Sequence, residues 1–288
     1  MYKEISLEKI KLDLINLGVT KGDTLFITAD LMKVGYSRKG RKNIYSDWVK
    51  VFNEVLGEEG TFMTVSFSKS YPLFSFDKQK PFDNKVSTDS GALSKALLDN
   101  ENSIRSSHPT NSYVAVGKNA EFLTKDHNEK SFSYDPTKKM LDLGGKNLML
   151  GTIDEKNAPM VFHYVQQLLG YTLKDPLSGL TGCFYKDTEG NLRRFIRKDL
   201  GGCSAAGHKL YSHFSENGCI SLGKVGKAES ALIDMRKSFK VCLKIMESNP
   251  QFSMCEDKSC ISCYGKYANT GIYSFYVMLN YFLKYLFK

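Results

Sequence analysis

Helix-patterned and strand-patterned segments alternate along the first 170 residues of the chain. Apolar residues recur at helical spacing from Leu7 to Leu17, where Gly18 ends the run, and the segment 23–28 then has the apolar pattern of a buried strand. The alternation continues with helix patterns at 46–57, 89–99, 118–124 and 158–169 and strand patterns at 61–67, 112–116 and 146–151. Such alternation is typical of a sheet covered by helices, so the sequence predicts an α/β fold.

The pattern changes after Gly170. The stretch CFYKDTEGNLRRFIRK, 183–198, alternates on both sides of a turn and predicts a β-hairpin in a smaller region, and a long helix is expected from about Lys227 to Ser248. We therefore expect three parts. They are an α/β core over 1–170, an inserted hairpin and loop subdomain over 171–226, and a C-terminal part over 227–288 that contains a helix, a cysteine-rich segment and an aromatic tail.

The charge balance limits the classes of partner. Forty Lys and Arg residues against 31 Asp and Glu give a formal charge of +9, which favours acidic partners such as nucleotides or phosphorylated cofactors. The basic residues form only short clusters, RKGRK at 38–42 and RRFIRK at 193–198, with no nucleic-acid-binding motif, so nucleic acid is not an expected partner. The first 19 residues lack the apolar segment of a signal peptide, and we expect a cytoplasmic protein.

The seven cysteines are expected to be thiols or metal ligands, since disulfides are rare in the cytoplasm. Cys255, Cys260 and Cys263 have the C-x4-C-x2-C spacing that occurs in zinc and iron–sulfur sites, and Cys203 or Cys219 is available as a fourth ligand. Plain thiols are the preferred interpretation. No metal is therefore expected at the catalytic site, and these cysteines remain candidate ligands.

Three stretches place polar groups where a strand ends or a helix begins. In ITADLMKVG, 27–35, a strand runs into a turn whose backbone amides can hold a phosphate or a thioester, and DSGALSKALLDN, 89–100, offers a helix N-terminus. In 148–170, a helix begins near Pro159 and carries His163 in its first turns. A helix N-terminus favours the neutral imidazole, which is the form that a general base needs.

Together these stretches resemble the aminoglycoside 3-N-acetyltransferase family. The resemblance is densest over 89–120, in GALSKALLDNENSIRSSHPTNSYVAVGKNA. It continues in PFD at 81–83, in GGKNLMLGT at 144–152 with the following VFH, and in VGKA at 225–228. This resemblance implies a three-layer α/β/α sandwich with a mixed central sheet, and transfer of an acetyl group from acetyl-coenzyme A to an amine.

The resemblance also implies roles for individual residues. His163 falls on the family's catalytic histidine and would act as general base, because an alkylammonium with a pKa near ~10 must lose a proton before it attacks the thioester. His108 falls on the family's His-Pro histidine and would shape the pocket. The coenzyme would be bound by the loop that lines its channel and by two serines, and an oxyanion would be stabilised by amides of that loop or by Ser112. These coenzyme residues are Ala29, Asp30, Leu31, Lys33, Gly35, Ser107 and Ser112.

Two positions depart from the family's pattern. Where the family has a glutamate three positions after the histidine, this chain has Gln166, which can orient an imidazole but cannot stabilise its cation as a carboxylate does. Asp83, on the long loop 67–88, could supply the missing charge. The family's His-x-Ser-Leu run is replaced here by TADL at 28–31, which alters the coenzyme loop.

The acceptor is expected to be an amino sugar carried on a nucleotide or lipid phosphate in surface-polysaccharide biosynthesis, because a basic chain suits a polycationic aminoglycoside poorly. Aminoglycoside resistance is one alternative, and a non-catalytic binding or scaffold protein on the same fold is another. The segment GIYSFYVMLNYFLKYLFK, 271–288, is too short and too rich in tyrosine for a transmembrane span. It could lie in a membrane interface or dock on the body or a second subunit. The expected partners are coenzyme A and a small amine, with peripheral membrane contact or a homodimer left open.

Overall fold

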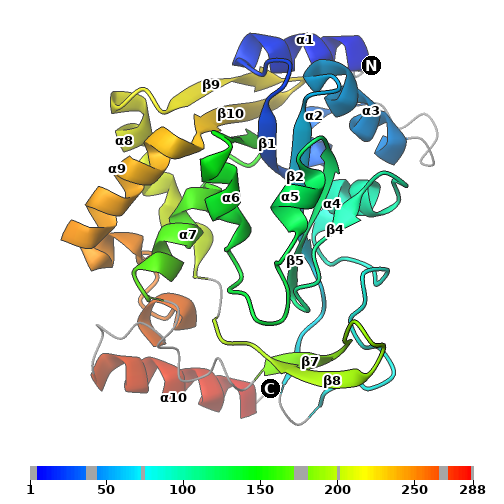
Figure 1. Cartoon of the computed structure of the whole chain (residues 1–288). Helices are drawn as coiled ribbons and strands as arrows, with labels where there is room; N and C mark the ends of the chain where they lie inside the picture. Colours follow the sequence, from blue (N-terminus) through cyan, green and yellow to red (C-terminus); the bar gives the residue numbers. More distant parts are fainter. Residues whose placement is uncertain are drawn as a thin grey trace.

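The computed structural model describes residues 5–36, 44–72, 75–171, 181–199, 202–265 and 272–286 (Figure 1). A seven-stranded sheet with the strand order β4-β5-β2-β1-β6-β10-β9 forms its centre. These strands are β1 (Thr24–Ala29), β2 (Thr61–Phe67), β4 (Ile104–Arg105), β5 (Asn111–Gly117), β6 (Lys146–Leu150), β9 (Ile220–Val225) and β10 (Ala228–Asp234). β1 pairs in parallel with β2 and β6, and the other pairings in this sheet are antiparallel, so the sheet is mixed as expected.

Helices cover both faces of this sheet. One face carries α1 (Leu7–Leu17), α2 (Leu31–Val34), α3 (Ile44–Leu56) and α4 (Gly91–Leu98); the other carries α5 (Ala120–Thr124), α6 (Pro136–Asp142), α7 (Met160–Leu168), α8 (Leu210–Glu216) and α9 (Met235–Ser248). Side chains of a strand alternate between the two cores: Leu25 and Ile27 enter the first, and Phe26 between them enters the second. The expected three-layer α/β/α sandwich is confirmed.

Local sequence signals explain where these elements begin and end. The Ser6 side chain accepts a hydrogen bond from the Lys9 backbone N–H at 3.2 Å and caps α1. Gly18 ends that helix in the left-handed region, at φ 108°, where a side chain would be strained. β2 has the bounds expected from its apolar pattern, and the other elements expected between residues 6 and 169 are present within a few residues of their expected ends.

The long helix expected from Lys227 to Ser248 is wrong in its first third. Ala228–Asp234 form strand β10, which pairs antiparallel with β6 and β9, and α9 begins only at Met235. Ala231 enters one core and Leu232 the other, so β10 is buried on both faces and lacks the alternation that distinguishes a strand from a helix. Its position beside β6 decides its conformation, which the sequence pattern alone does not reveal.

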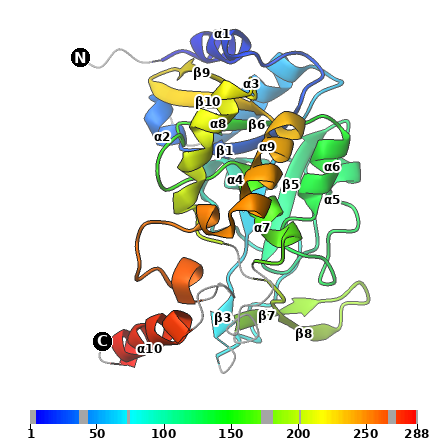
Figure 2. The ribbon, with the colours of Figure 1, turned by 90° about the vertical axis from the view of Figure 1, so that its left-hand side faces the viewer.

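The expected hairpin forms a second, smaller sheet. β7 (Thr181–Lys186) and β8 (Leu192–Ile196) pair antiparallel, and β3 (Tyr71–Pro72) from the long loop adds a third strand. This sheet and α10 (Ile272–Leu286) lie at the end of the molecule opposite α1 (Figures 1 and 2). The range 171–226 does not form one insertion, because β9 extends the central sheet and α8 packs on its second face.

Within the described residues, no helix combines the length and the hydropathy that a membrane span requires. α10 nevertheless exposes several large apolar side chains, including Ile272, Phe275 and Tyr276. Contact of this helix with a membrane interface or with a second subunit stays a prediction.

Candidate active site

The three parallel strands at the centre of the sheet end at the same edge. In sheets of this class, ligands bind outside the carboxyl ends of the strands, where the connections diverge to opposite sides. Two hollows lie at this edge. One, of about 840 Å³, is lined from Ala29 to Tyr36 and by the start of α4, and we call it the outer groove. The other, of about 550 Å³, is lined by His163 with residues that follow β1, β2 and β6, and we call it the histidine cavity.

His163 is held from both ring nitrogens. Its Nδ1 lies 2.9 Å from Gln166 Oε1 and its Nε2 lies 3.0 Å from Ser204 Oγ. The amide oxygen can only accept, so Nδ1 carries the proton and donates it to Gln166. Nε2 therefore has the free lone pair and accepts from the Ser204 hydroxyl. This is the tautomer that presents a base toward Ser204 and the cavity.

The surroundings of His163 keep it neutral. The ring stacks on Tyr134, with centroids 5.2 Å apart and an interplanar angle of 16°, and Phe162 meets it edge-on. Burial lowers the pKa of His163 from its ordinary value, and the hydrogen bond to Gln166 opposes this shift only in part. At neutral pH the imidazole is therefore unprotonated, as a general base must be.

Ser204 is a site residue to which the sequence does not point. It begins the short 3-10 helix η2 (Ser204–Lys209), which follows the small sheet in the chain. The only local signal is the run of small residues GGCSAAG at 201–207, and such a run carries no indication of a distant histidine. Gly202, two residues before Ser204, packs closely on Gln166. A Cβ at position 202 would lie only 2.2 Å from Gln166 Oε1. The backbone at Gly202 thus packs directly against Gln166, the hydrogen-bond partner of His163.

His108 acts on the site through a turn. Its Nδ1 accepts hydrogen bonds from the backbone N–H groups of Asn111, at 3.0 Å, and of Thr110, at 3.4 Å. The ring is 1% exposed and stacks on His127 with centroids 4.9 Å apart. Burial, aided by His127, holds the pKa of His108 well below its ordinary value. Thr110 and Asn111 line the histidine cavity, so His108 fixes the turn that presents them.

Arg105 fastens the long loop to the sheet. Its guanidinium donates to Ser112 Oγ and to Ser68 Oγ, both at 2.9 Å, and lies 5.1 Å from the centroid of the Phe82 ring. Burial lowers the pKa of Arg105 to about 10, against the opposing effect of Asp83. Because Ser68 lines the histidine cavity, this buried cation shapes one wall of the site.

The residues expected to bind coenzyme gather in the outer groove. Ala29, Asp30, Leu31, Lys33 and Gly35 all line it. Gly35 has φ 77°, and a Cβ there would lie 2.8 Å from Cδ of Lys227. The aliphatic part of the Lys227 side chain, in the VGKA motif, therefore packs against Gly35 at the side of the outer groove.

The outer groove and the histidine cavity are adjacent. Asn157 lines both of them. Thr28 of the histidine cavity and Thr152 of the outer groove lie with their Oγ1 atoms 3.2 Å apart. An extended ligand in the outer groove can therefore reach toward His163 past these three polar side chains.

Three other expected residues line neither hollow. Asp83 Oδ1 accepts from the Lys85 backbone N–H at 2.8 Å, and the partner of His163 Nδ1 is Gln166 instead. Ser107 is exposed, and its backbone N–H donates to the His127 carbonyl at 2.9 Å. Ser112 is fully buried and donates to the Ser66 carbonyl at 2.6 Å, so the geometry does not support the oxyanion role expected for it.

Comparison with known proteins identifies the family. Residues 26–247 match the family model described as aminoglycoside 3-N-acetyltransferase. The chain belongs to this family. Within it, aminoglycoside N(3)-acetyltransferase VII of Streptomyces paromomycinus is 27% identical over 173 residues, covering 54% of this chain and 58% of that protein. Aminoglycoside N(3)-acetyltransferase III of Serratia marcescens is 28% identical over 179 residues, covering 57% and 64%. The chain thus matches less than two thirds of either relative's length.

Solved structures show the same fold. The apoenzyme of aminoglycoside acetyltransferase AAC(3)-IVa matches with a TM-score of 0.73 at 22% identity, covering 91% of this chain and 96% of that one. AAC-IIIb in a binary complex with CoASH matches with a TM-score of 0.70 at 22% identity, covering 85% and 97%. The family match includes the His108 turn, His163 and Ser204, whereas the cysteine-rich segment after residue 254 and α10 lie outside it.

Proposed function

We propose that the protein transfers the acetyl group of acetyl-coenzyme A to an amine of an aminoglycoside. The observation that carries the proposal is the neutral His163, oriented by Gln166 and presenting Nε2 toward Ser204 in the histidine cavity. The relatives in the family are named as acetyltransferases of aminoglycosides, and this favours an aminoglycoside over the amino sugar of polysaccharide biosynthesis.

Acetyl-coenzyme A would occupy the outer groove with its thioester end in the histidine cavity. The groove adjoins that cavity at Asn157, which lines both, and its other wall includes Gly91 and Ala92 at the N-terminus of α4. Backbone N–H groups at a helix N-terminus favour phosphate. In sequence, the basic cluster RKGRK at 38–42 closely follows Tyr36 of the groove and adds positive charge suited to the coenzyme's phosphates.

The acceptor amine would attack the thioester directly. His163 Nε2 takes a proton from the amine, either after the substrate displaces the Ser204 hydroxyl or through that hydroxyl as a relay. The amine nitrogen forms a bond to the carbonyl carbon, the C–S bond then breaks, and the imidazolium returns a proton to the leaving sulfur. The hydroxyl of Thr28, which lines the cavity beside Thr152 of the outer groove, would donate to the oxyanion, and losing such a donor typically costs about 2.7 to 4 kcal/mol of barrier.

A panel assay tests this proposal. Purified protein is mixed with acetyl-coenzyme A and a set of aminoglycosides, and release of the coenzyme thiol and the mass of the product are measured. We expect the wild-type protein to form an acetylated aminoglycoside and the His163→Ala variant to form none. If the protein shows no turnover with any amine and coenzyme A does not raise its melting temperature, the non-catalytic scaffold alternative is the better description.

One observation favours a second acceptor. Among the residues that line the histidine cavity in the described part of the chain, Arg197 is the charged one and none is a carboxylate. A polycation gains little from such a lining, whereas an amino sugar with a phosphate or carboxylate group would pair with Arg197. The same panel therefore includes nucleotide-linked amino sugars, and a larger kcat/KM for these than for aminoglycosides would assign the chain to sugar biosynthesis.

A further inference from the structure

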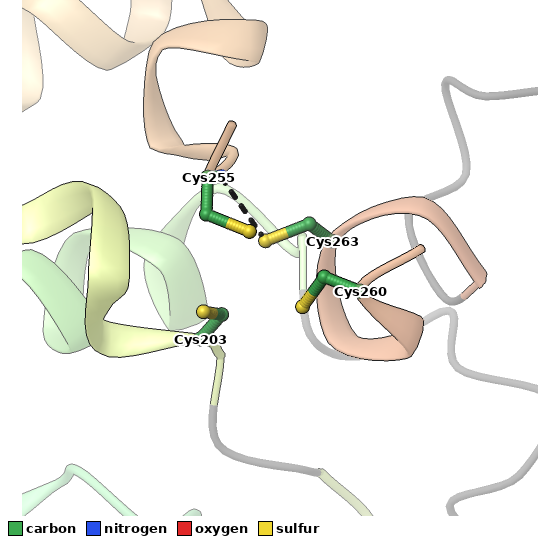
Figure 3. Close-up of side chains that lie close together, drawn as sticks. All are labelled: Cys203, Cys255, Cys260 and Cys263. Atoms are coloured by element: carbon green, nitrogen blue, oxygen red, sulfur yellow. Dashed lines mark hydrogen bonds between the residues drawn. The ribbon is translucent and has the colours of Figure 1, made fainter. Parts of the chain in front are cut away.

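Four cysteine sulfurs from two distant parts of the chain converge beside η2. Cys203 immediately precedes η2, and Cys255, Cys260 and Cys263 lie in the segment that follows η3 (Pro250–Ser253). All four Sγ atoms lie within 4.8 Å of one another. Figure 3 shows the four side chains gathered in one place, with the sulfurs of Cys255 and Cys263 next to each other and Cys203 contributed by a different segment of the chain.

The arrangement has the dimensions of a single tetrahedral ion. Zinc with four Zn–S bonds of about 2.3 Å holds its sulfurs about 3.8 Å apart, which small side-chain rotations reach from the observed spacing. Sulfurs within 4.8 Å of one another also leave no room between them for a cluster of several metal atoms. All four cysteines are free thiols, so the group is not a pair of disulfides in this structure.

The backbone already supports thiolate sulfur at this centre. The Cys255 N–H donates to Cys263 Sγ at 3.3 Å, and the Ala205 N–H donates to Cys203 Sγ at 3.4 Å. Hydrogen bonds of this kind orient metal ligands and stabilise their charge. Lys258 lies close by, with its Nζ 3.0 Å from Tyr264 Oη, and adds a positive charge near a centre that four thiolates would make negative.

The site is closed and structural in character. Cys255 and Cys263 are buried, and Cys203 and Cys260 are half-buried. A small apolar cluster surrounds them, formed by Met254, Tyr264 and Val277 of α10. With four protein ligands no coordination position is left for substrate, which distinguishes structural from catalytic zinc.

We propose that Cys203, Cys255, Cys260 and Cys263 bind one zinc ion, and that this ion fastens the C-terminal segment to the catalytic body. Each thiol loses its proton as its Zn–S bond forms. The family match assigns no metal, and three of the four ligands lie beyond its end. The preference for plain thiols drawn from the sequence is replaced, because the fold brings Cys203 across more than fifty residues to complete the set.

The ion would also act on the active site, an extension that rests on the proposed function. Cys203 is bonded in sequence to Ser204, whose hydroxyl lies 3.0 Å from His163 Nε2. Fixing Cys203 to the metal fixes the start of η2 and so the partner of the base. Cys203 is thus a positioning residue as well as a ligand.

Elemental analysis of the full chain, purified without chelators under reducing conditions, tests the site. We expect one zinc per chain, lost in Cys203→Ser and Cys260→Ser and retained in Cys219→Ser, a buried cysteine outside the group. Because a ligand variant could fail to fold, the wild-type protein is also stripped and reloaded with Co²⁺, which should give the absorption of tetrahedral cobalt thiolate. Stoichiometric iron, substoichiometric metal, or disulfides seen by mass would each overturn the assignment of zinc.

The link to His163 is tested separately. Removal of zinc from the wild type should lower kcat while KM for acetyl-coenzyme A stays within about twofold, and added Zn²⁺ should restore kcat. Stoichiometric zinc with an unchanged kcat after removal overturns the link but leaves the metal site standing. Stoichiometric zinc in a protein without acetyltransferase activity overturns the proposed function alone.

Discussion

The side chain of His163 is hydrogen-bonded at both ends, to Gln166 through Nδ1 at 2.9 Å and to Ser204 through Nε2 at 3.0 Å. Gln166 and His163 lie three residues apart on α7, so one helical face sets the tautomer. Ser204 comes from a different segment and sets the direction of the lone pair. The orientation of the His163 imidazole therefore depends on two elements that are remote in sequence, and substitutions on each element can separate their contributions.

Replacement of His163 by alanine should abolish most of the turnover. Loss of a positioned general base usually lowers the rate by about 10²- to 10⁴-fold, and we expect kcat to fall by that factor while KM for acetyl-coenzyme A changes little. His108→Ala is the comparison, since it should loosen the turn that carries Thr110 and Asn111 and raise KM for the acceptor as well. Steady-state thiol release measures both. A near-normal kcat for His163→Ala would exclude it as the base.

The Gln166→Glu substitution should move the pH profile of the proposed acetyl transfer. Burial lowers the pKa of His163 in the native protein, so the acidic limb of activity is expected below the ordinary histidine range. A carboxylate at 166 would stabilise the imidazolium and raise that pKa, so the limb should move to higher pH and activity above it should increase. Profiles of kcat against pH for the wild type, Gln166→Glu and Gln166→Met provide the test. An upward shift in the methionine variant as well would contradict a role for the charge.

The stacked histidines should make the fold sensitive to acid. Burial lowers the pKa of His127 to about 4, while the unfolded chain protonates near 6.5, so the unfolded state binds more protons between these values. The contribution of neutral His127 to the free energy of unfolding is therefore fully present above pH ~6.5. It is lost as the pH falls toward 4, and the loss from this group alone is up to about 3 kcal/mol. His108, stacked on His127, shifts in the same direction.

Urea unfolding at a series of pH values measures this loss. His127→Gln should reduce the slope of stability between pH 6.5 and 4, whereas His213→Gln, at a side chain that is 40% exposed, serves as the control. An unchanged slope in His127→Gln would show that other groups account for the acid sensitivity.

Periodicity and caps in the sequence are sufficient to predict the core of the fold. α1 between Ser6 and Gly18 carries its own start and stop signals, and β2 is a short run of apolar and hydroxyl side chains typical of a strand. β10 has the sequence pattern of a helix because a strand buried on both faces has no period of two, and only its pairing with β6 and β9 selects the strand. Strand order and the position of β9 likewise depend on contacts that local pattern does not encode.

The site is predictable from sequence where its residues lie on one segment. The loop from Ala29 to Gly35 and His163 can be located, because each occupies the end of a strand or the start of a helix. The pairing of Ser204 with His163 has no such signal, and the sequence offers Cys203 only as one of two alternatives, with Cys219, for a fourth ligand beside the three later cysteines. In both cases the fold joins segments more than forty residues apart, so the local sequence neither reveals Ser204 as the partner of His163 nor decides between Cys203 and Cys219.

Alanine at position 35 should weaken coenzyme binding without affecting the chemical step. Gly35 lies in the outer groove at φ 77°, and a Cβ there would lie 2.8 Å from the Lys227 side chain, so the lysine must move and the groove narrows. We expect KM for acetyl-coenzyme A to rise about tenfold, equivalent to about 1.4 kcal/mol of binding, with kcat at saturation largely retained. Gly57→Ala is the matched control, since Gly57 has φ 67° at the end of α3, an added Cβ there would meet no atom within 4 Å, and the residue lines neither hollow. The control carries the same backbone strain, so an equal rise in KM in both variants would attribute the effect to stability and leave the outer groove without a role in coenzyme binding.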